Sequence, residues 1–320
     1  VSICLITENG LQERALSSGA NDEPVTFYRS HIQYHQNSPK WCEHLKVNVP
    51  LELFESAHLR FTFCHCSSKE RERKFMGFSF LPLADQNGAC LVDGEHELFV
   101  YKCDNERKLD DVSFYLHVPW GNSNEKIGSS GHHMSSTSIA SCAISSSSAS
   151  LATASALINS RSSKEAFRIR TSLVSSKLTQ NSDILSLLKW SCIPLDQVND
   201  ALQRIGRVPG EEMVKFLEDI LDALFTLFTM SAGALETSSQ MTIIFRVLVD
   251  FFKTLNDPKF VSYRAALECY IENQFSAPLV YSSLMACVKK YIELVIIFQS
   301  DVHSPPSLSG VTKRELEFIL

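Results

Sequence analysis

The chain has 320 residues, of which 44% are hydrophobic, and a net charge of −6. This length can hold two domains that each bury a core, and the composition excludes a fibrous or wholly disordered chain. The negative balance argues against general nucleic-acid binding, which requires a basic surface. We therefore expect no nucleic-acid partner, and any anionic partner must meet a local cluster of cations.

The cysteines give no sign of a metal site. There are 10 of them, and only Cys64 and Cys66 lie close together, on either side of His65 and without the CxxC spacing of zinc ligands. We interpret them as reduced thiols of a cytoplasmic protein and expect no metal and no cofactor.

The sequence contains no apolar run long enough to span a membrane. The longest run, 291–298, includes Glu293 and is far shorter than the roughly 20 residues that a membrane helix needs. We expect a soluble protein. Because the chain opens at Val1 inside a strand-like segment, we also expect it to be an internal part of a longer protein.

Residues 1–120 are predicted to form an antiparallel β domain. Short apolar or alternating segments are separated by turn signals such as Asn9-Gly10, a pattern typical of a β-sandwich. The expected strands are 1–7, 27–35, 41–50, 58–64, 75–82, 96–102 and 113–118.

The stretch 58–102 organises this domain. Leu59, Phe61 and Phe63 alternate with polar residues, as in a strand with one buried face, and an aromatic-rich strand follows at 75–82. The connection 67–74 is too charged to be core. The sequence therefore predicts a hairpin that places a positive loop at one end of the sheet.

Residues 121–163 change character, since 16 of them are serine. Such a segment cannot bury enough apolar surface to offset its chain entropy, so we expect a disordered loop there. Residues 167–174 alternate again, and 164–176 is predicted to be the final strand of the sandwich.

Residues 177–300 are predicted to be helical. Apolar residues recur at three- and four-residue steps, most clearly in 211–230, which carries Glu211 and Glu212 in its first turn. The other expected helices are 184–190, capped near Ser182-Asp183, 194–205, 242–255, 262–274 and 279–298. Successive helices with short loops favour an array of stacked helix pairs, followed by a tail at 301–320. The predicted fold class is thus α+β and multidomain.

Enzymatic chemistry is not indicated. The sequence has no GxSxG, P-loop, HExxH or GxGxxG motif. Aspartates such as Asp85, Asp93 and Asp104 fall in expected loops but do not form the alternating acidic set of a calcium loop. We expect neither catalysis nor a metal.

The positive loop is the best candidate site. Five cations against two carboxylates lie between Arg60 and Lys74, on a chain that is acidic as a whole. A local excess of this kind suits a small anion or an anionic membrane, and arginine binds phosphate oxygens in a bidentate manner. The alternative is a solvated hairpin tip whose charges block edge-to-edge pairing.

Five blocks of the sequence, taken together, resemble a known family. They are NSPKWCEHLKVNVP, HLRFTFCHCSSKERERKFMGFSFLPL, DGEHELFVYK, KLTQNSDILSLLKW and GEEMVKFLEDILDALF, in this order. They resemble the dedicator of cytokinesis (DOCK) family, and within it the Rac activators of the A or B type. The match covers about 1–120 and 165–295, which corresponds to the DHR-1 domain and the helices behind it.

The resemblance implies a C2-like β-sandwich at 1–120, completed by the strand at 164–176, that binds phosphatidylinositol 3,4,5-trisphosphate without calcium. An armadillo-like helical array follows at 177–300. Exchange of guanine nucleotide on Rac-type GTPases would belong to a DHR-2 domain outside this chain, and binding of the ELMO scaffold to another outside region. The chain itself would be a regulatory, non-enzymatic membrane-recruitment module, cytoplasmic and brought to the inner face of the plasma membrane.

Carried over onto this sequence, the family's basic loop maps onto Lys69, Arg71, Arg73 and Lys74, with Lys40 in the SPKW turn as a further candidate. Glu70 and Glu72 interrupt the basic run. The contrasting hypothesis is a protein-interaction scaffold that uses the helical array and binds no lipid.

Overall fold

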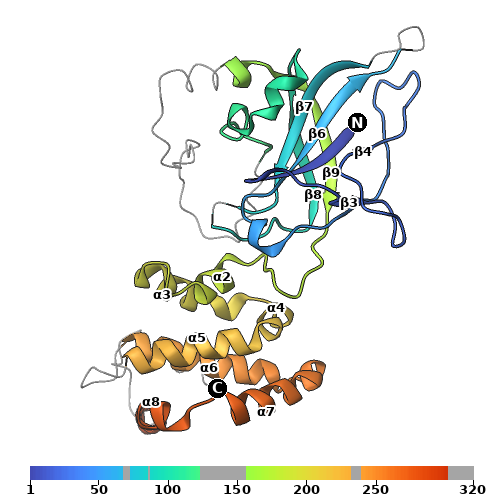
Figure 1. Ribbon diagram of the computed structural model, residues 1–320. Coiled ribbons are helices and arrows are strands. Elements are labelled where there is room, and N and C mark those ends of the chain that lie inside the picture. Colours follow the sequence, from blue (N-terminus) through green and yellow to red (C-terminus); the bar gives the residue numbers. More distant parts are fainter. Residues whose placement is uncertain (68–72, 86, 123–155, 232–238, 302–320) are drawn as a thin grey trace. The chain divides into compact units, whose positions relative to one another are not determined.

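The computed structural model describes residues 1–67, 73–85, 87–122, 156–231 and 239–301. The chain forms two compact units, Val1–Ser175 and Ser176–Leu320, each of which is described by itself. The first is built on an antiparallel sheet and the second on helices (Figure 1). The predicted fold class, an antiparallel β domain followed by an all-α array, is confirmed.

The main sheet has the strand order β2-β1-β6-β7-β8-β9, with β4 also paired to β1, and a small second sheet pairs β3 with β5. The strands are β1 (Ser2–Thr7), β2 (Gly10–Leu11), β3 (Leu16–Ser17), β4 (Tyr28–Arg29), β5 (Lys46–Val47), β6 (His58–His65), β7 (Lys74–Pro82), β8 (Gly94–Lys102) and β9 (Arg161–Thr171). The predicted hairpin is confirmed, since β6 and β7 pair from His58↔Pro82 to His65↔Lys74.

Both faces of the sheet are buried, although the alternation in β6 predicted only one. Leu59 and Phe61 join Leu5, Leu16, Leu81 and Leu98 in a core on the side of β3 and β5. On the other face, Phe78 and Phe80 of β7 pack with Tyr115 and Leu109. His58 and Thr62 of β6, polar residues on this second face, are therefore buried as well.

One expected strand, 113–118, is absent, and this prediction is wrong. The chain that covers the second face forms two 3-10 helices, η2 (Glu106–Asp110) and η3 (Val112–Phe114), and residues 115–117 are turns. The Asn105 and Asp111 side chains accept backbone hydrogen bonds from Arg107 and Ser113, and such local caps compete with strand pairing.

Two other expected strands are much shorter than predicted. Of 27–35 only β4 is a strand, and of 41–50 only β5. Between them, side chains satisfy the backbone in place of a ladder: Glu43 accepts from the His31 amide and Trp41 donates to the His31 carbonyl oxygen.

The final strand begins earlier than expected. β9 starts at Arg161, inside the serine-rich segment, and follows a helical turn at 156–159 whose Leu157 is buried in the second core. The expected disorder of the rest of that segment, and the tail, lie outside the described residues.

The second unit consists of helices packed around one core. They are α2 (Ser182–Leu188), α3 (Leu195–Arg204), η4 (Ile205–Arg207), α4 (Gly210–Lys215), α5 (Leu217–Ser231), α6 (Ser239–Leu255), η5 (Pro258–Tyr263), α7 (Arg264–Asn273) and α8 (Ala277–Asp301). The core runs through all the long helices, with Leu187, Val198, Leu224, Ile244, Phe251 and Val280 among its members. None of the helices, over the residues described, is both long and apolar enough to cross a membrane.

The helix ends differ from the expectation in two places. The predicted helix 211–230 is broken at Phe216, whose φ of −111° and ψ of 35° end α4 before α5 begins. The N-cap of α2 is Asn181, whose side chain accepts from the amides of Asp183 and Ile184, so the cap lies one residue before the expected Ser182.

Candidate functional site

Two loops leave the same end of the main sheet. β1 pairs with β6 along one edge and with β4 along the other, so that Ser2 lies opposite both Thr62 and Arg29. Both neighbours run antiparallel to β1 and thus point the same way, and Arg29 and Thr62 are two strand spacings, about 10 Å, apart. β6 continues beyond Thr62 to His65, so the hairpin loop begins farther out than the loop after β4. Glu43 of the first loop and Arg73 of the hairpin both lie close enough to the Val1 amino group to shift its pKa, in opposite directions, so the two loops lie near the same end of β1.

The described part of the hairpin loop presents exposed cations. Arg73 and Lys74 are exposed, and Lys74 pairs in register with His65 at the first position of β7. Arg73 lies close enough to the Cys64 thiol to lower its pKa, although burial is the larger influence and raises it overall. Of the predicted site residues, Lys69 and Arg71 lie outside the described residues.

Lys40 belongs to the neighbouring loop. Its side chain is exposed, and its carbonyl oxygen accepts a hydrogen bond from the Gln33 side chain at 3.3 Å. Within the part of the chain that the structure describes, the side chains of Lys40, Arg73 and Lys74 form no ion pair. The structure therefore brings the loops of these three cations to one end of the sheet and, as far as the described residues go, pairs none of them with a carboxylate.

Arg60 does not belong to this surface. Its guanidinium donates to the Leu109 carbonyl oxygen and lies close enough to Tyr115 and Cys4 to lower their pKa values, although burial raises both overall. The local charge excess that the sequence suggested is therefore smaller by one cation, because Arg60 fastens the 3-10 layer to the sheet.

Three further cations lie at the same end and were missed in the sequence. Arg29 is the last residue of β4, Lys102 pairs with Gly77 near the start of β7, and Arg161 begins β9 opposite Tyr101. Arg161 also covers the Phe99 ring, 4.0 Å from its centroid. No local sequence pattern predicts that these three cations lie together, because their positions depend on strand order and register.

The described side chains of this surface are cations rather than metal ligands. Over the described residues, no three His, Cys, Asp or Glu side chains are grouped so that they could hold a metal ion. In the loop after β4, Glu43 accepts a hydrogen bond from the His31 amide at 3.0 Å and lies close enough to Tyr28 to help raise its pKa. The exposed cations are left to neutralise an external negative charge.

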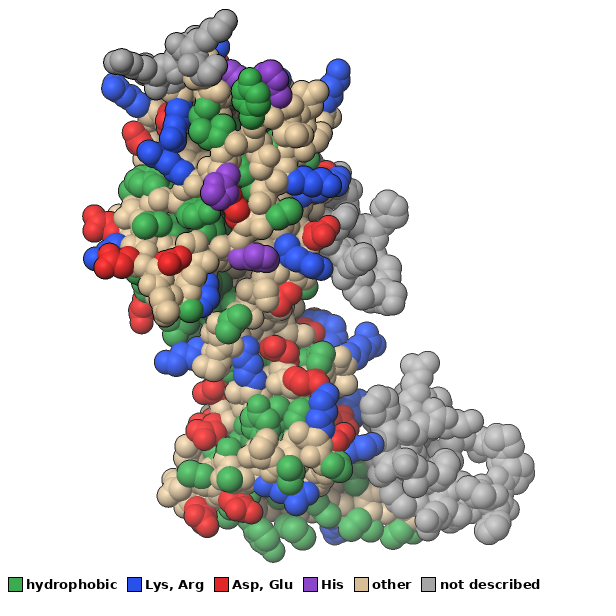
Figure 2. All heavy atoms as spheres, turned by 90° about the vertical axis from the view of Figure 1, so that its right-hand side faces the viewer, with side chains coloured by type: hydrophobic (Ala, Val, Ile, Leu, Met, Phe, Trp, Pro, Cys, Tyr) green, Lys and Arg blue, Asp and Glu red, His purple; other side chains and the backbone are tan. Residues whose placement is uncertain are grey.

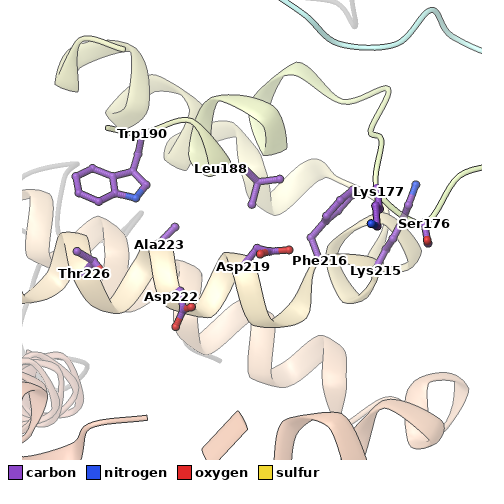
Figure 3. Close-up of a pocket in the computed structure, with 10 residues that line it drawn as sticks. All are labelled: Ser176, Lys177, Leu188, Trp190, Lys215, Phe216, Asp219, Asp222, Ala223 and Thr226. Atoms are coloured by element: carbon purple, nitrogen blue, oxygen red, sulfur yellow. The ribbon is translucent and has the colours of Figure 1, made fainter. Parts of the chain in front are cut away.

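The helical unit contains a separate open pocket of about 570 Å³ (Figure 3). Asp219, Asp222 and Thr226 line it from one face of α5, and Leu188 and Trp190 line it from the end of α2. Lys215 closes one end, where its Nζ donates to the Leu178 carbonyl oxygen at 2.6 Å. A pocket lined by an indole ring and by carboxylates suits a cationic side chain, although Asp222 already accepts a hydrogen bond from the Tyr270 hydroxyl at 2.8 Å.

The two units together define a C2-like domain followed by an array of helix pairs. Family models divide the chain in the same way: residues 1–183 match the C2 domain in Dock180 and Zizimin proteins, and residues 194–301 match the dedicator of cytokinesis (DOCK) TPR region. The chain belongs to the dedicator of cytokinesis family, as the five sequence blocks predicted. The matched model describes the helices as TPR, where the resemblance suggested armadillo-like, and both terms denote stacked helical pairs.

Similar proteins cover most of this chain. Human dedicator of cytokinesis protein 4 is 36% identical over 297 residues, which is 90% of this chain and 13% of that protein. Human dedicator of cytokinesis protein 3 is 36% identical over 290 residues, again 90% and 13%. Mouse dedicator of cytokinesis protein 9 is 32% identical over 75 residues, 20% of this chain and 4% of that protein. The chain thus spans only 13% of the length of the first two relatives.

Proposed function

We propose that this chain is the phosphoinositide-dependent membrane-recruitment module of a DOCK-type guanine nucleotide exchange factor for Rac-type GTPases. Exchange and ELMO binding would reside in parts of the protein outside this chain, which itself is not an enzyme. The protein would be cytoplasmic and recruited to the inner face of the plasma membrane, with phosphatidylinositol 3,4,5-trisphosphate as the ligand.

One observation supports the lipid ligand most. Lys40, Arg73 and Lys74 are exposed at one end of a sheet and form no ion pair with another described residue, while the chain as a whole carries −6. An exposed cation outside an ion pair keeps its attraction for an external anion. Each is expected to contribute about 1 kcal/mol near an anionic surface.

The test is co-sedimentation with vesicles. The protein is mixed with phosphatidylcholine vesicles that carry either the 3,4,5-trisphosphate lipid or enough phosphatidylserine to match its charge. Wild-type protein should prefer the phosphoinositide vesicles. A triple alanine variant with Lys40→Ala, Arg73→Ala and Lys74→Ala should bind these vesicles at least tenfold more weakly than wild type. Adding Lys69→Ala and Arg71→Ala should remove most of the remaining binding.

The matched control changes the same number of exposed cations elsewhere. Arg170 lies at the opposite end of β9, and Lys253 and Arg264 lie in the helical unit. The triple alanine variant at these positions should bind as wild type does. Equal losses in both triple variants, or equal binding to both kinds of vesicle, would contradict the proposal.

A second candidate function, the protein-interaction scaffold, is favoured by the pocket in the helical unit. Its acidic wall and Trp190 suit an arginine or lysine of a partner segment. Asp219→Asn with Trp190→Ala should then abolish binding of a basic peptide, measured by fluorescence anisotropy, and leave vesicle binding unchanged. If the scaffold is the whole function, wild-type protein will not bind vesicles.

A further inference from the structure

The loop between β4 and β5 exposes large apolar side chains beside the cationic end of the sheet. Ile32 is 66% exposed and Tyr34 is 76% exposed, and neither belongs to a core cluster. Both lie within ten residues of Lys40 in the same loop. Other large apolar side chains of the chain are as exposed, and what distinguishes this pair is its place in one loop beside exposed cations.

The loop is held in shape by its own side chains. The His31 amide donates to Glu43 Oε1 at 3.0 Å, Trp41 Nε1 donates to the His31 carbonyl oxygen at 3.0 Å, and Gln33 Nε2 donates to that of Lys40. The Trp41 ring in turn packs edge-on against Phe167 of β9, with centroids 6.1 Å apart. These contacts tie the base of the loop to the sheet.

The tip of the loop presents an aromatic platform. Tyr34 stacks on His35, with ring centroids 4.1 Å apart and planes 9° from parallel, and a positive φ of 49° at His35 turns the chain there. Because the base is fixed, exposing this tip does not depend on unfolding the loop. A tyrosine with an apolar ring and a polar hydroxyl suits the boundary between lipid headgroups and acyl chains.

Apolar and cationic side chains thus share one surface. The register around β1 brings this loop to the same end of the sheet as Arg73 and Lys74, and Arg29 lies directly before it. Figure 2 shows hydrophobic, histidine and Lys/Arg side chains close together at the top of the β unit. A soluble anion would use only the cations, whereas the surface of an anionic bilayer offers both headgroup charge and an apolar interior.

We propose that this loop inserts Ile32 and Tyr34 into the lipid interface while the neighbouring cations bind the headgroups. The inference rests on the proposed function and adds to it that the partner is the bilayer itself rather than a free inositol phosphate. The cations attract the β unit to the membrane. Ile32 and Tyr34 then bury apolar surface in the lipid, which slows dissociation of the protein from the membrane.

The test uses a double variant, Ile32→Ser with Tyr34→Ser, which we call the loop variant, and compares it with a matched control variant. Val92 is 65% exposed and Leu116 is 44% exposed, and both lie at the other end of the sheet. Val92 shortly precedes β8. Leu116 follows Tyr115, whose hydroxyl is hydrogen-bonded to His58, the first residue of β6. Val92→Ser with Leu116→Ser removes a comparable apolar surface there. Each protein is tested with phosphoinositide vesicles, with charge-matched phosphatidylserine vesicles and with soluble inositol 1,3,4,5-tetrakisphosphate.

The loop variant should bind vesicles about tenfold more weakly than wild type and the soluble headgroup equally well, and the control should match wild type throughout. If the loop variant binds vesicles as wild type does, insertion is wrong even where phosphoinositide selectivity stands. If wild type binds both vesicle types equally and the loop variant loses both, insertion stands and the phosphoinositide ligand is wrong. Failure of wild type to bind any vesicle overturns both.

Discussion

His58 Nε2 lies 2.7 Å from the hydroxyl oxygen of Tyr115, so that a buried hydrogen bond joins the first residue of β6 to the end of η3. The Tyr115 ring also packs against Phe78 and Phe80, with centroid distances of 5.4 and 5.2 Å. The adjacent Arg60 guanidinium donates to the Leu109 carbonyl oxygen and lies close to Tyr115 and Cys4. This polar cluster holds the 3-10 layer on the sheet.

The first prediction concerns pH and stability. Burial, with the Arg60 charge acting in the same direction, lowers the pKa of His58 from 6.5 to about 4. Because the folded pKa is the lower one, the stabilisation by neutral His58 is complete above about pH 6.5 and is lost as the pH falls toward 4. A shift of this size corresponds to about 3 kcal/mol over that window.

Urea unfolding at pH 7 and at pH 4.5 measures this effect. His58→Gln should be less stable than wild type at pH 7, since Tyr115 loses its partner, but should lose less stability on acidification. His44→Gln, at an exposed position, is the control and should follow wild type. An unchanged pH dependence in His58→Gln would show that another group is responsible.

The second prediction concerns the contact between α7 and α5. The Tyr270 hydroxyl donates to Asp222 Oδ1 at 2.8 Å, and burial together with this bond raises the pKa of the tyrosine. Tyr270→Phe leaves the carboxylate without its donor and should lower the free energy of unfolding by about 2 kcal/mol. Chemical denaturation measures the loss. Tyr263→Phe, at a partly exposed position in η5, should change stability little, and an equal loss there would contradict the assignment.

The third prediction concerns the narrow pairing of β7 with β8. A β-carbon at Gly77 would overlap the carbonyl oxygen of Tyr101, a backbone atom that cannot move aside as a side chain can. Gly77→Ala should therefore destabilise the β unit by about 3 kcal/mol. The nearest atom to a β-carbon at Gly206 would be 3.8 Å away, so Gly206→Ala is the control. Thermal melting measures the loss of stability. If Gly77→Ala and Gly206→Ala melt at the same temperature, the close approach of Gly77 to the Tyr101 carbonyl oxygen is wrong.

Local patterns predicted the central hairpin well but not the flanking segments. Alternation over Leu59, Phe61 and Phe63 is a property of neighbouring residues, and it located β6 to within one residue. The apolar and aromatic composition of 27–35 and 113–118 suggested strands as well. Whether such segments pair depends on side-chain bonds to the backbone, such as that of Glu43 to the His31 amide and the local cap of Asp111 on Ser113, and no hydrophobic period reports these.

The candidate site shows the same division. A charged run between two strands was enough to predict a cationic hairpin end, and Arg73 and Lys74 are exposed there. The role of Arg60 could not be predicted, because its partners Leu109 and Tyr115 are 49 and 55 positions away in sequence. The contributions of Arg29 and Arg161 likewise depend on strand register rather than on any local motif.

The last prediction concerns ionic strength. Raising salt from about 0.1 M to about 1 M shortens the Debye length from about 10 Å to about 3 Å. Attraction between anionic vesicles and exposed cations such as Lys40, Arg73 and Lys74 should fall steeply over this range, whereas the burial of Ile32 and Tyr34 should not. Co-sedimentation over a salt series is therefore expected to show a steep decline that levels off in wild type. The triple alanine variant should begin lower and decline less, and the loop variant should decline without levelling off. Parallel curves for all three proteins would mean that neither group of side chains contacts the membrane.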